Sequence, residues 1–136
     1  MVISFVLEYQ AKQSYDSLKT GITIDVILRY ANLEQPCPAK IDTGSEVCLF
    51  SRTLADFLEI DVESGYREIF STLAGNLIAF QHEIELETFG LLFQTKVYFA
   101  ESYALQRNLL GRRGFLQLVT IGLDDYKSEL YLSPRF

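Results

Sequence analysis

The segment at residues 42–45, Asp-Thr-Gly-Ser, is the part of the chain best suited to do chemistry. Asp42 follows an apolar run and precedes small residues, so its carboxylate is expected on an accessible turn where it could polarise a water molecule. Gly44 is expected to give this turn a backbone shape that residues with a Cβ atom avoid. Hydrolysis without a metal or a covalent nucleophile uses one carboxylate as base and another as acid. The segment therefore predicts half of a hydrolytic site.

The second carboxylate has no candidate in a repeated motif, because the Asp-Thr-Gly sequence occurs once in the 136 residues. This length fits one domain and is about half of what a chain with two such turns would need. Two identical chains related by a two-fold axis would bring two copies of Asp42 into one cleft. We therefore expect an obligate homodimer. A monomeric β-barrel that binds a small ligand is the more distant alternative, and it predicts one Asp42 per particle.

A second segment, Asn-Leu-Leu-Gly-Arg at residues 108–112, complements the first. With these two motifs in this order and a β-rich stretch between them, the chain resembles single-domain retroviral-type aspartic proteases, the retropepsin-like family, over roughly residues 20–132. The resemblance implies an all-β, barrel-like acid protease fold with one or two short helices and one lobe per chain. Residues 1–20 would form an N-terminal extension, able to add a strand to a dimer sheet, and residues 21–136 the protease domain.

The activity that this resemblance implies is that of an aspartic endopeptidase. A water molecule held between the two Asp42 carboxylates of a homodimer would attack the peptide bond at acidic to near-neutral pH, with no cofactor and no metal. A peptide or protein would be the substrate. The alternative is a catalytically silent, dimeric peptide-binding or scaffolding module with the same fold, and the intact Asp42, Thr43 and Gly44 favour chemistry over this alternative.

Supporting roles also follow from the resemblance. Thr43 would form a hydrogen bond across the two-fold axis, and the Ser45 hydroxyl would bond the outer oxygen of Asp42. Glu46 and Arg112 would form a buried ion pair near the dimer interface, whereas two solvated charges would contribute little. Three residues of the second segment would pack beneath the turn and fix its position: Leu109, Leu110 and Gly111.

Substrate contacts are expected from residues of the cleft and of the covering hairpin, the flap: Lys40, Val47, Leu49, Ala74, Gly75 and Asn76. Lys40 stands where the family usually has an apolar residue. Its charge would favour an ionised aspartate or an acidic substrate side chain, unless the side chain extends into solvent. Gly75 is the one glycine at the hairpin tip, which implies a stiffer flap than a glycine-rich one.

Alternating apolar and polar residues predict the strands that position the site. Residues 21–30 alternate with period two and predict a half-buried strand. Residues 32–38 are expected to form a loop because they contain two prolines. Residues 66–71 and 77–86 predict a hairpin with Gly75 and Asn76 at the centre of its turn. Further strands are expected at residues 1–9, 39–42, 47–50, 91–99, 108–110, 119–123 and 129–132. Short helices are expected after Ser51, burying Leu54, Phe57 and Leu58, and from Gly111 through Leu118.

Composition sets limits on the partners. There are 12 Lys and Arg against 18 Asp and Glu, a formal charge of −6, so a nucleic-acid backbone is not expected as the ligand. No stretch is apolar for the roughly 20 residues that span a bilayer, and the N-terminus has no basic leader, so a cytoplasmic protein with no membrane partner is expected. Cys37 and Cys48 are expected as reduced thiols rather than a disulfide. His82 is expected to have a structural or surface role.

Overall fold

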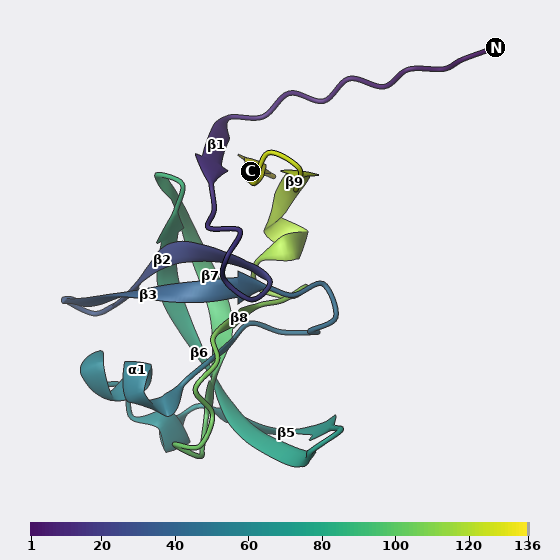
Figure 1. Ribbon diagram of the computed structural model, residues 1–136. Helices are drawn as coiled ribbons and strands as arrows, with labels where there is room; N and C mark the ends of the chain where they lie inside the picture. The colour runs from purple at the N-terminus through teal and green to yellow at the C-terminus, as the bar shows by residue number, and fades with distance from the viewer. Residues whose placement is uncertain (136) are drawn as a thin grey trace.

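Strands make up most of the computed structural model, which describes residues 1–135 (Figure 1). The strands are β1 (Ala11–Ser14), β2 (Ile22–Tyr30), β3 (Leu33–Ile41), β4 (Leu49–Phe50), β5 (Tyr66–Thr72), β6 (Gly75–Thr88), β7 (Leu91–Ala100), β8 (Leu109–Leu110), β9 (Val119–Asp124) and β10 (Glu129–Pro134). The helical segments are α1 (Arg52–Phe57) and two 3-10 turns, η1 (Val62–Ser64) and η2 (Leu116–Leu118). The expected all-β class with short helices is confirmed.

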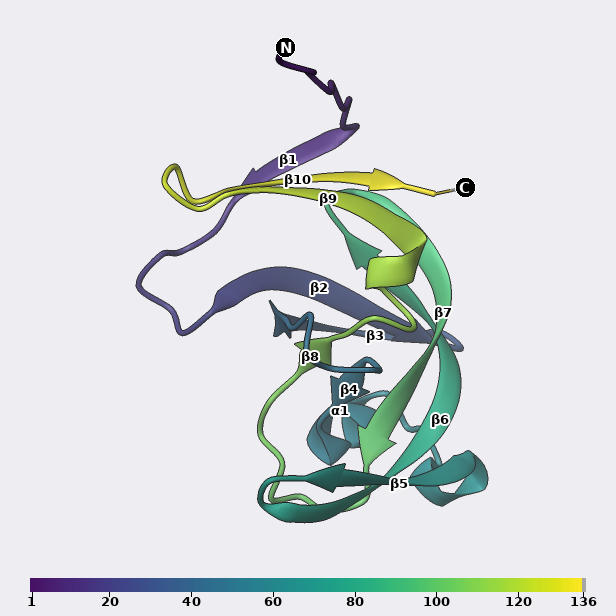
Figure 2. The ribbon, with the colours of Figure 1, turned by 90° about the vertical axis from the view of Figure 1, so that its right-hand side faces the viewer.

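The strands form a seven-stranded sheet in the order β2-β3-β8-β4-β7-β6-β5 and a three-stranded sheet in the order β1-β10-β9. An additional pairing of β2 with β6 brings the two ends of the larger sheet toward each other. The long strands β6 and β7 curve along one side of the molecule and connect the region of β5 with that of the smaller sheet (Figure 2). Strands distant in sequence therefore meet at β8, which pairs with β3 and β4 on either side of the Asp42 turn.

The strands with clear period-two patterns form as expected. In β2, Ile24, Val26 and Leu28 are buried and Asp25 is exposed. The β6–β7 hairpin turns at Phe89 and Gly90, with φ values of 57° and 72°. Two positive φ values in a two-residue loop match the right-handed twist of the flanking strands.

Strand β3 replaces the loop expected at residues 32–38. It pairs with β2 along its whole length, placing Pro36 opposite Ile27 and Pro38 opposite Asp25. The two prolines are two residues apart, so they face the same edge of β3, and the neighbouring β8 pairs only with Lys40 and Ile41. Proline is tolerated in a strand where its missing N–H faces an open edge. The loop prediction was wrong because it ignored this edge.

The β5–β6 hairpin forms where expected, but its turn lies two residues earlier. Thr72 pairs with Gly75, so Leu73 and Ala74 form the loop and Gly75 takes a φ of +119°. The Thr72 hydroxyl stabilises the turn, because it donates to the Gly75 carbonyl at 2.5 Å and accepts from the Ala74 N–H at 3.3 Å. Asn76 lies in β6 rather than at the centre of the turn.

Three other expected elements differ in the structure. Residues 1–9 form no strand; the start of the chain runs away from its body, whereas Tyr9 packs against Tyr131, and the first strand starts at Ala11 (Figure 1). The helix after Ser51 is capped as expected, with the Leu54 N–H donating to the Ser51 hydroxyl, but Phe57 is 61% exposed and Ala55 takes its place in the core. The helix expected from Gly111 through Leu118 is only the three-residue turn η2.

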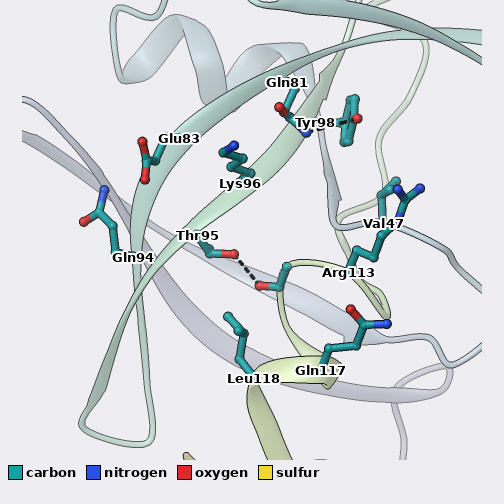
Figure 3. A pocket seen from close by; sticks show the side chains of 11 residues that line it. Val47, Gln81, Glu83, Gln94, Thr95, Lys96, Tyr98, Arg113, Gln117 and Leu118 are labelled. Atoms are coloured by element: carbon teal, nitrogen blue, oxygen red, sulfur yellow. Dashed lines mark hydrogen bonds between the residues drawn. The ribbon is translucent and has the colours of Figure 1, made fainter. Parts of the chain in front are cut away.

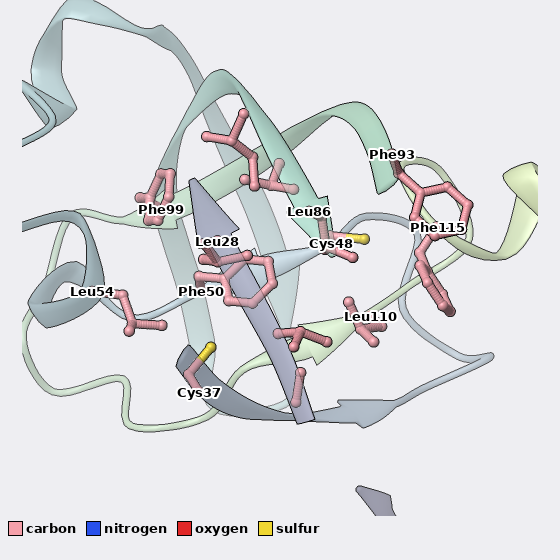
Figure 4. Close-up of a cluster of buried hydrophobic side chains, with 14 of the residues drawn as sticks. Leu28, Cys37, Cys48, Phe50, Leu54, Leu86, Phe93, Phe99, Leu110 and Phe115 are labelled. Atoms are coloured by element: carbon pink, nitrogen blue, oxygen red, sulfur yellow. The ribbon is translucent and has the colours of Figure 1, made fainter. Parts of the chain in front are cut away.

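The core lies between the curved strands and α1. Its largest fully buried side chains include Phe50, Phe93, Phe99 and Phe115. Leu110 of β8 also belongs to this cluster, so the strand beside the Asp42 turn is anchored in the core (Figure 4). Cys37 and Cys48 are buried free thiols in the same cluster, as expected.

Candidate functional site

Strand β8 holds the turn that carries Asp42. It runs parallel to the end of β3 and antiparallel to β4, so it lies between the strand that enters the turn and the strand that leaves it. The Asp42 N–H donates to the Leu110 carbonyl at 3.0 Å, and the Lys40 N–H donates to the Asn108 carbonyl at 2.9 Å. The backbone of Asp42 is therefore fixed by a strand that comes from a distant part of the sequence.

The side chain of Asp42 is oriented within its own turn. Its Oδ1 accepts a hydrogen bond from the Gly44 N–H at 2.9 Å, and its carbonyl accepts one from the Ser45 N–H at 3.1 Å. Asp42 is half-buried, whereas Thr43 and Gly44 are exposed. A carboxylate with one oxygen held by a backbone donor and a neighbouring oxygen available is suited to binding a water molecule or a second carboxylic acid.

Gly44 has a different role from the one expected. Its φ is outside the left-handed region, so the turn does not need the conformational freedom of glycine there. A Cβ atom at this position would lie 3.2 Å from the Asp42 Oδ1. Gly44 therefore matters because of the close carboxylate and the N–H that it donates.

Gly111 is where the chain after β8 passes closest to the turn. A Cβ atom here would lie 2.2 Å from the Val47 carbonyl oxygen and 2.6 Å from the Ser45 carbonyl oxygen. The next two residues bond the same stretch, with the Arg112 N–H donating to Ser45 and the Arg113 N–H to Glu46, both at 2.9 Å. Only glycine allows this approach of two backbones.

A cavity of about 300 Å³ opens beside Asp42. We call it the Asp42 cavity; its lining includes Asp42, Glu46, Val47, Leu49, Phe70 and Leu109. Val47 and Leu49 are each 6% exposed, line the cavity, and pack with Ala79 and Tyr98 in a small buried cluster. An apolar cavity next to a carboxylate can take a hydrophobic side chain and place the adjoining peptide bond near the acid.

The β5–β6 hairpin supplies the wall opposite Asp42, through Phe70, Ser71, Thr72 and Leu77. Phe70 also packs edge-on against Tyr98, with ring centroids 5.1 Å apart. The expected contacts Ala74, Gly75 and Asn76 do not line the cavity and are exposed at the end of the hairpin. Contact of these three residues with a substrate stays a prediction.

Two expected side-chain contacts are replaced. The Ser45 hydroxyl donates to the Val47 carbonyl at 2.7 Å instead of bonding Asp42, which stabilises the exit from the turn. Glu46 pairs with Arg113 at 3.8 Å, not with Arg112, and both members of this pair are exposed. The pair follows from the backbone register, because the Arg113 N–H donates to the carbonyl of Glu46 itself.

Lys40 lies in a neighbouring cavity rather than in the Asp42 cavity. Leu109 lines both, so it forms the wall between them. A third cavity, of about 430 Å³, adjoins the Asp42 cavity at Val47 and is bordered by Arg113, Gln81 and Gln117 (Figure 3). Its floor is held by the Thr95 hydroxyl, which donates to the Gly114 carbonyl at 2.7 Å.

No protein-family model matches the sequence, and no curated protein sequence matches it. Solved structures with a similar fold do exist. A retropepsin-like aspartic protease from Rickettsia conorii is 19% identical with a TM-score of 0.59, over 85% of this chain and 100% of that chain. The EIAV protease complexed with the inhibitor HBY-793 is 18% identical with a TM-score of 0.55, over 70% of this chain and 85% of that chain. The chain has a retropepsin-like fold. At these identities the likeness establishes the fold alone.

Within this retropepsin-like fold, Asn108 is a positioning residue that the sequence did not reveal. Its amide group donates to the Pro38 carbonyl at 3.0 Å, and its amide oxygen accepts from the Ser51 N–H at 3.1 Å. The side chain therefore ties β8 both to β3 and to the start of α1. The carbonyl that Asn108 offers to Lys40 adds a third link beside the turn.

His82 has the structural role expected of it. It is 9% exposed, and its Nε2 lies 2.9 Å from the Val62 carbonyl, to which it donates. Within residues 1–135, no group of three or more His, Cys, Asp and Glu is placed to hold a metal ion. Over the same residues, every helix is too short or too polar to cross a lipid bilayer.

Proposed function

We propose that the chain is an aspartic endopeptidase that works as a homodimer, with Asp42 from each copy facing the other across a two-fold axis. The observation that carries this proposal is the position of Asp42: a carboxylate fixed by β8 and by the Gly44 N–H, at the edge of an apolar cavity. The retropepsin-like fold supports it. The single Asp-Thr-Gly turn per chain supports the shared site.

The chemistry follows from two carboxylates at short distance. Ionising both is unfavourable, so the pair shares one proton. The ionised Asp42 takes a proton from the water between them while the protonated partner donates one to the carbonyl oxygen of the peptide bond. A tetrahedral diol forms and then collapses with protonation of the leaving amine, so no covalent enzyme intermediate arises.

Supporting residues act through the turn. We propose that Thr43, which is exposed, bonds the partner's turn, while Leu109, Leu110 and Gly111 hold the turn on its own chain. Residues 1–20 contribute to the assembly through β1, which already pairs with β10 at the edge of the smaller sheet. The apolar residues before β1 are exposed in the single chain, including Ile3, Phe5 and Leu7 at 65–89%. These exposed residues are available to a second copy.

The test is cleavage of a mixed peptide library between about pH 4 and 7 by the wild type and by Asp42→Asn, with the particle mass of both measured by sedimentation. Asp61→Asn is the matched control, because Asp61 is exposed and makes no side-chain capping bond. We expect cleavage by the wild type and by Asp61→Asn, none by Asp42→Asn, and twice the 15.6 kDa chain mass for all three.

Two results would contradict the proposal. Folded dimers that never cleave would favour the silent peptide-binding module. An active monomer would refute the shared site itself.

A further inference from the structure

The cavity that contains Lys40 has a chemical character opposite to that of the Asp42 cavity. It measures about 350 Å³, and we call it the basic cavity; its lining includes Thr20, Thr23, Lys40, Gln106, Arg107 and Leu109. Two cationic side chains and two hydroxyls line it, and no carboxylate does. The Asp42 cavity has two carboxylates, Asp42 and Glu46, and no cation. The shared wall Leu109 therefore separates a basic pocket from an acidic one.

The strand register explains why the basic cavity lies beside the site. Thr23 is directly opposite Lys40 in the β2–β3 pair, and Lys40 is opposite Leu109 in the β3–β8 pair. Residues opposite each other in adjacent strands project from the same face of a sheet. The hydroxyl, the ammonium group and the leucine thus form one row across three strands, and Asp42 follows Lys40 by two residues.

The position of the Lys40 ammonium group is set by a glycine. Gly21 has a φ of +70°, and a Cβ atom there would lie 2.3 Å from the Lys40 Cε and 3.2 Å from its Nζ. The lysine side chain therefore packs over Gly21, and it lines the basic cavity with Thr20 and Thr23 rather than the Asp42 cavity. Within residues 1–135, neither Lys40 nor Arg107 has a carboxylate within 4.0 Å, although the chain carries a net charge of −6.

We propose that the basic cavity binds an aspartate or glutamate side chain of the substrate, next to the hydrophobic side chain that enters the Asp42 cavity. This inference rests on the proposed function and specifies its substrate class. A carboxylate that accepts hydrogen bonds from Lys and Arg side chains forms charge-assisted hydrogen bonds, which are about twice as strong as neutral ones. Both cations occupy one small cavity, so the expected preference for Glu over the isosteric Gln is about tenfold in kcat/KM.

The experiment compares peptides that differ only at one position, with Glu, Gln or Leu placed in turn at each of the residues flanking an apolar side chain. The enzymes are the wild type, Lys40→Gln, Arg107→Gln and the control Lys127→Gln. Lys127 is an exposed lysine in the β9–β10 loop, so its substitution removes the same charge away from the cavity. We expect the wild type and the control to prefer Glu at one position. We expect both cavity variants to lose most of that preference, so that the ratio of kcat/KM for the Glu and Gln peptides falls toward one, whereas Lys127→Gln keeps the ratio of the wild type.

A second measurement separates this inference from the proposed function. Asp42→Asn retains both cations, so its affinity for fluorescent Glu and Gln peptides can be measured by anisotropy without cleavage. Asp42-dependent cleavage with equal rates for the Glu and Gln peptides would overturn the proposal that the basic cavity binds an acidic side chain, and it would leave the proposed protease function intact. If no peptide is cleaved, the binding measurement still decides. Tighter binding of the Glu peptide than of the Gln peptide, with the difference abolished by Lys40→Gln, would support acid binding in the basic cavity, and equal binding of the two peptides would overturn it.

Discussion

Substitution of Gly111 by alanine tests whether the close approach of β8 to the Asp42 turn controls both stability and activity. The added Cβ atom would lie 2.2 Å from the Val47 carbonyl oxygen and 2.6 Å from the Ser45 carbonyl oxygen. Nonbonded contacts of carbon atoms are optimal near 3.5–4.0 Å. Both obstacles are backbone atoms, so either β8 or the turn must move by roughly 1 Å.

The size of the effect follows from this displacement. Overpacking of a well-packed site lowers the free energy of unfolding by about 1–3 kcal/mol. A shift of about 1 Å in a catalytic group lowers the rate by about a hundredfold. We expect Gly111→Ala to show a lower urea midpoint and a loss of kcat that exceeds any change in KM, because the walls of the Asp42 cavity that the β5–β6 hairpin supplies remain in place.

The matched control is Gly122→Ala. Its Cβ atom would meet the ring of Tyr9 at 2.8 Å, and this side chain belongs to the N-terminal segment and can move aside. Urea unfolding of both variants, followed by circular dichroism, and steady-state cleavage of one peptide measure the two effects. If Gly111→Ala has the same urea midpoint as Gly122→Ala and a kcat within twofold of it, β8 does not hold the turn in the way described.

Three further predictions concern other parts of the chain. Burial raises the pKa of Cys37 and of Cys48 to about 12, so at pH 8 neither thiol should react with an aromatic disulfide until the protein is unfolded in guanidinium; rapid reaction of the native protein would contradict this burial. Asn108→Ala removes two side-chain hydrogen bonds and should lower the free energy of unfolding by about 1–2 kcal/mol in urea titrations, against almost no change for Asn76→Ala on the exposed hairpin. A hydrogen bond from the Arg52 guanidinium lowers the pKa of Glu63. The stability that this pair contributes is therefore present above the unfolded pKa of Glu63 and is lost as the pH falls through its lower folded pKa. Glu63→Gln should therefore flatten the decline in stability below about pH 4.5, and unchanged acid unfolding curves would refute the pairing.

The elements that could be predicted from the sequence are those specified by local patterns. Alternation with period two located β2, β6 and β7, since one face of each of these strands is more buried than the other. Ser51 marked the start of α1, because its side chain caps the helix by accepting from the N–H of a residue only three positions later. The Asp42 turn and the β8 segment were found because two short motifs, in this order and with a β-rich stretch between them, resemble those of the retropepsin-like family.

The elements that were missed depend on neighbours distant in sequence. The prolines of β3 are compatible with a strand only because one of its edges is open where they lie, and nothing local reveals an open edge. Phe57 has the helical spacing of a core residue, yet the neighbouring Ala55 faces the core. The partner of Glu46 depends on the path of the chain after Gly111, because there the Arg113 N–H donates to the Glu46 carbonyl and brings the two side chains together.

Strand β8 links the core to both halves of the proposed substrate site, although it has only two residues. Leu110 is fully buried among the core side chains, whereas its neighbour Leu109 forms the wall between the Asp42 cavity and the basic cavity. The carbonyl of Leu110 also accepts the hydrogen bond of the Asp42 N–H. Because the side-chain period of a strand is two, a slip of β8 by one residue would bring either Asn108 to the wall or Gly111 into the core in place of a leucine. It would also move the carbonyl that accepts the hydrogen bond of the Asp42 N–H. The register of this short strand therefore sets the position of Asp42 and of the wall between the two cavities together.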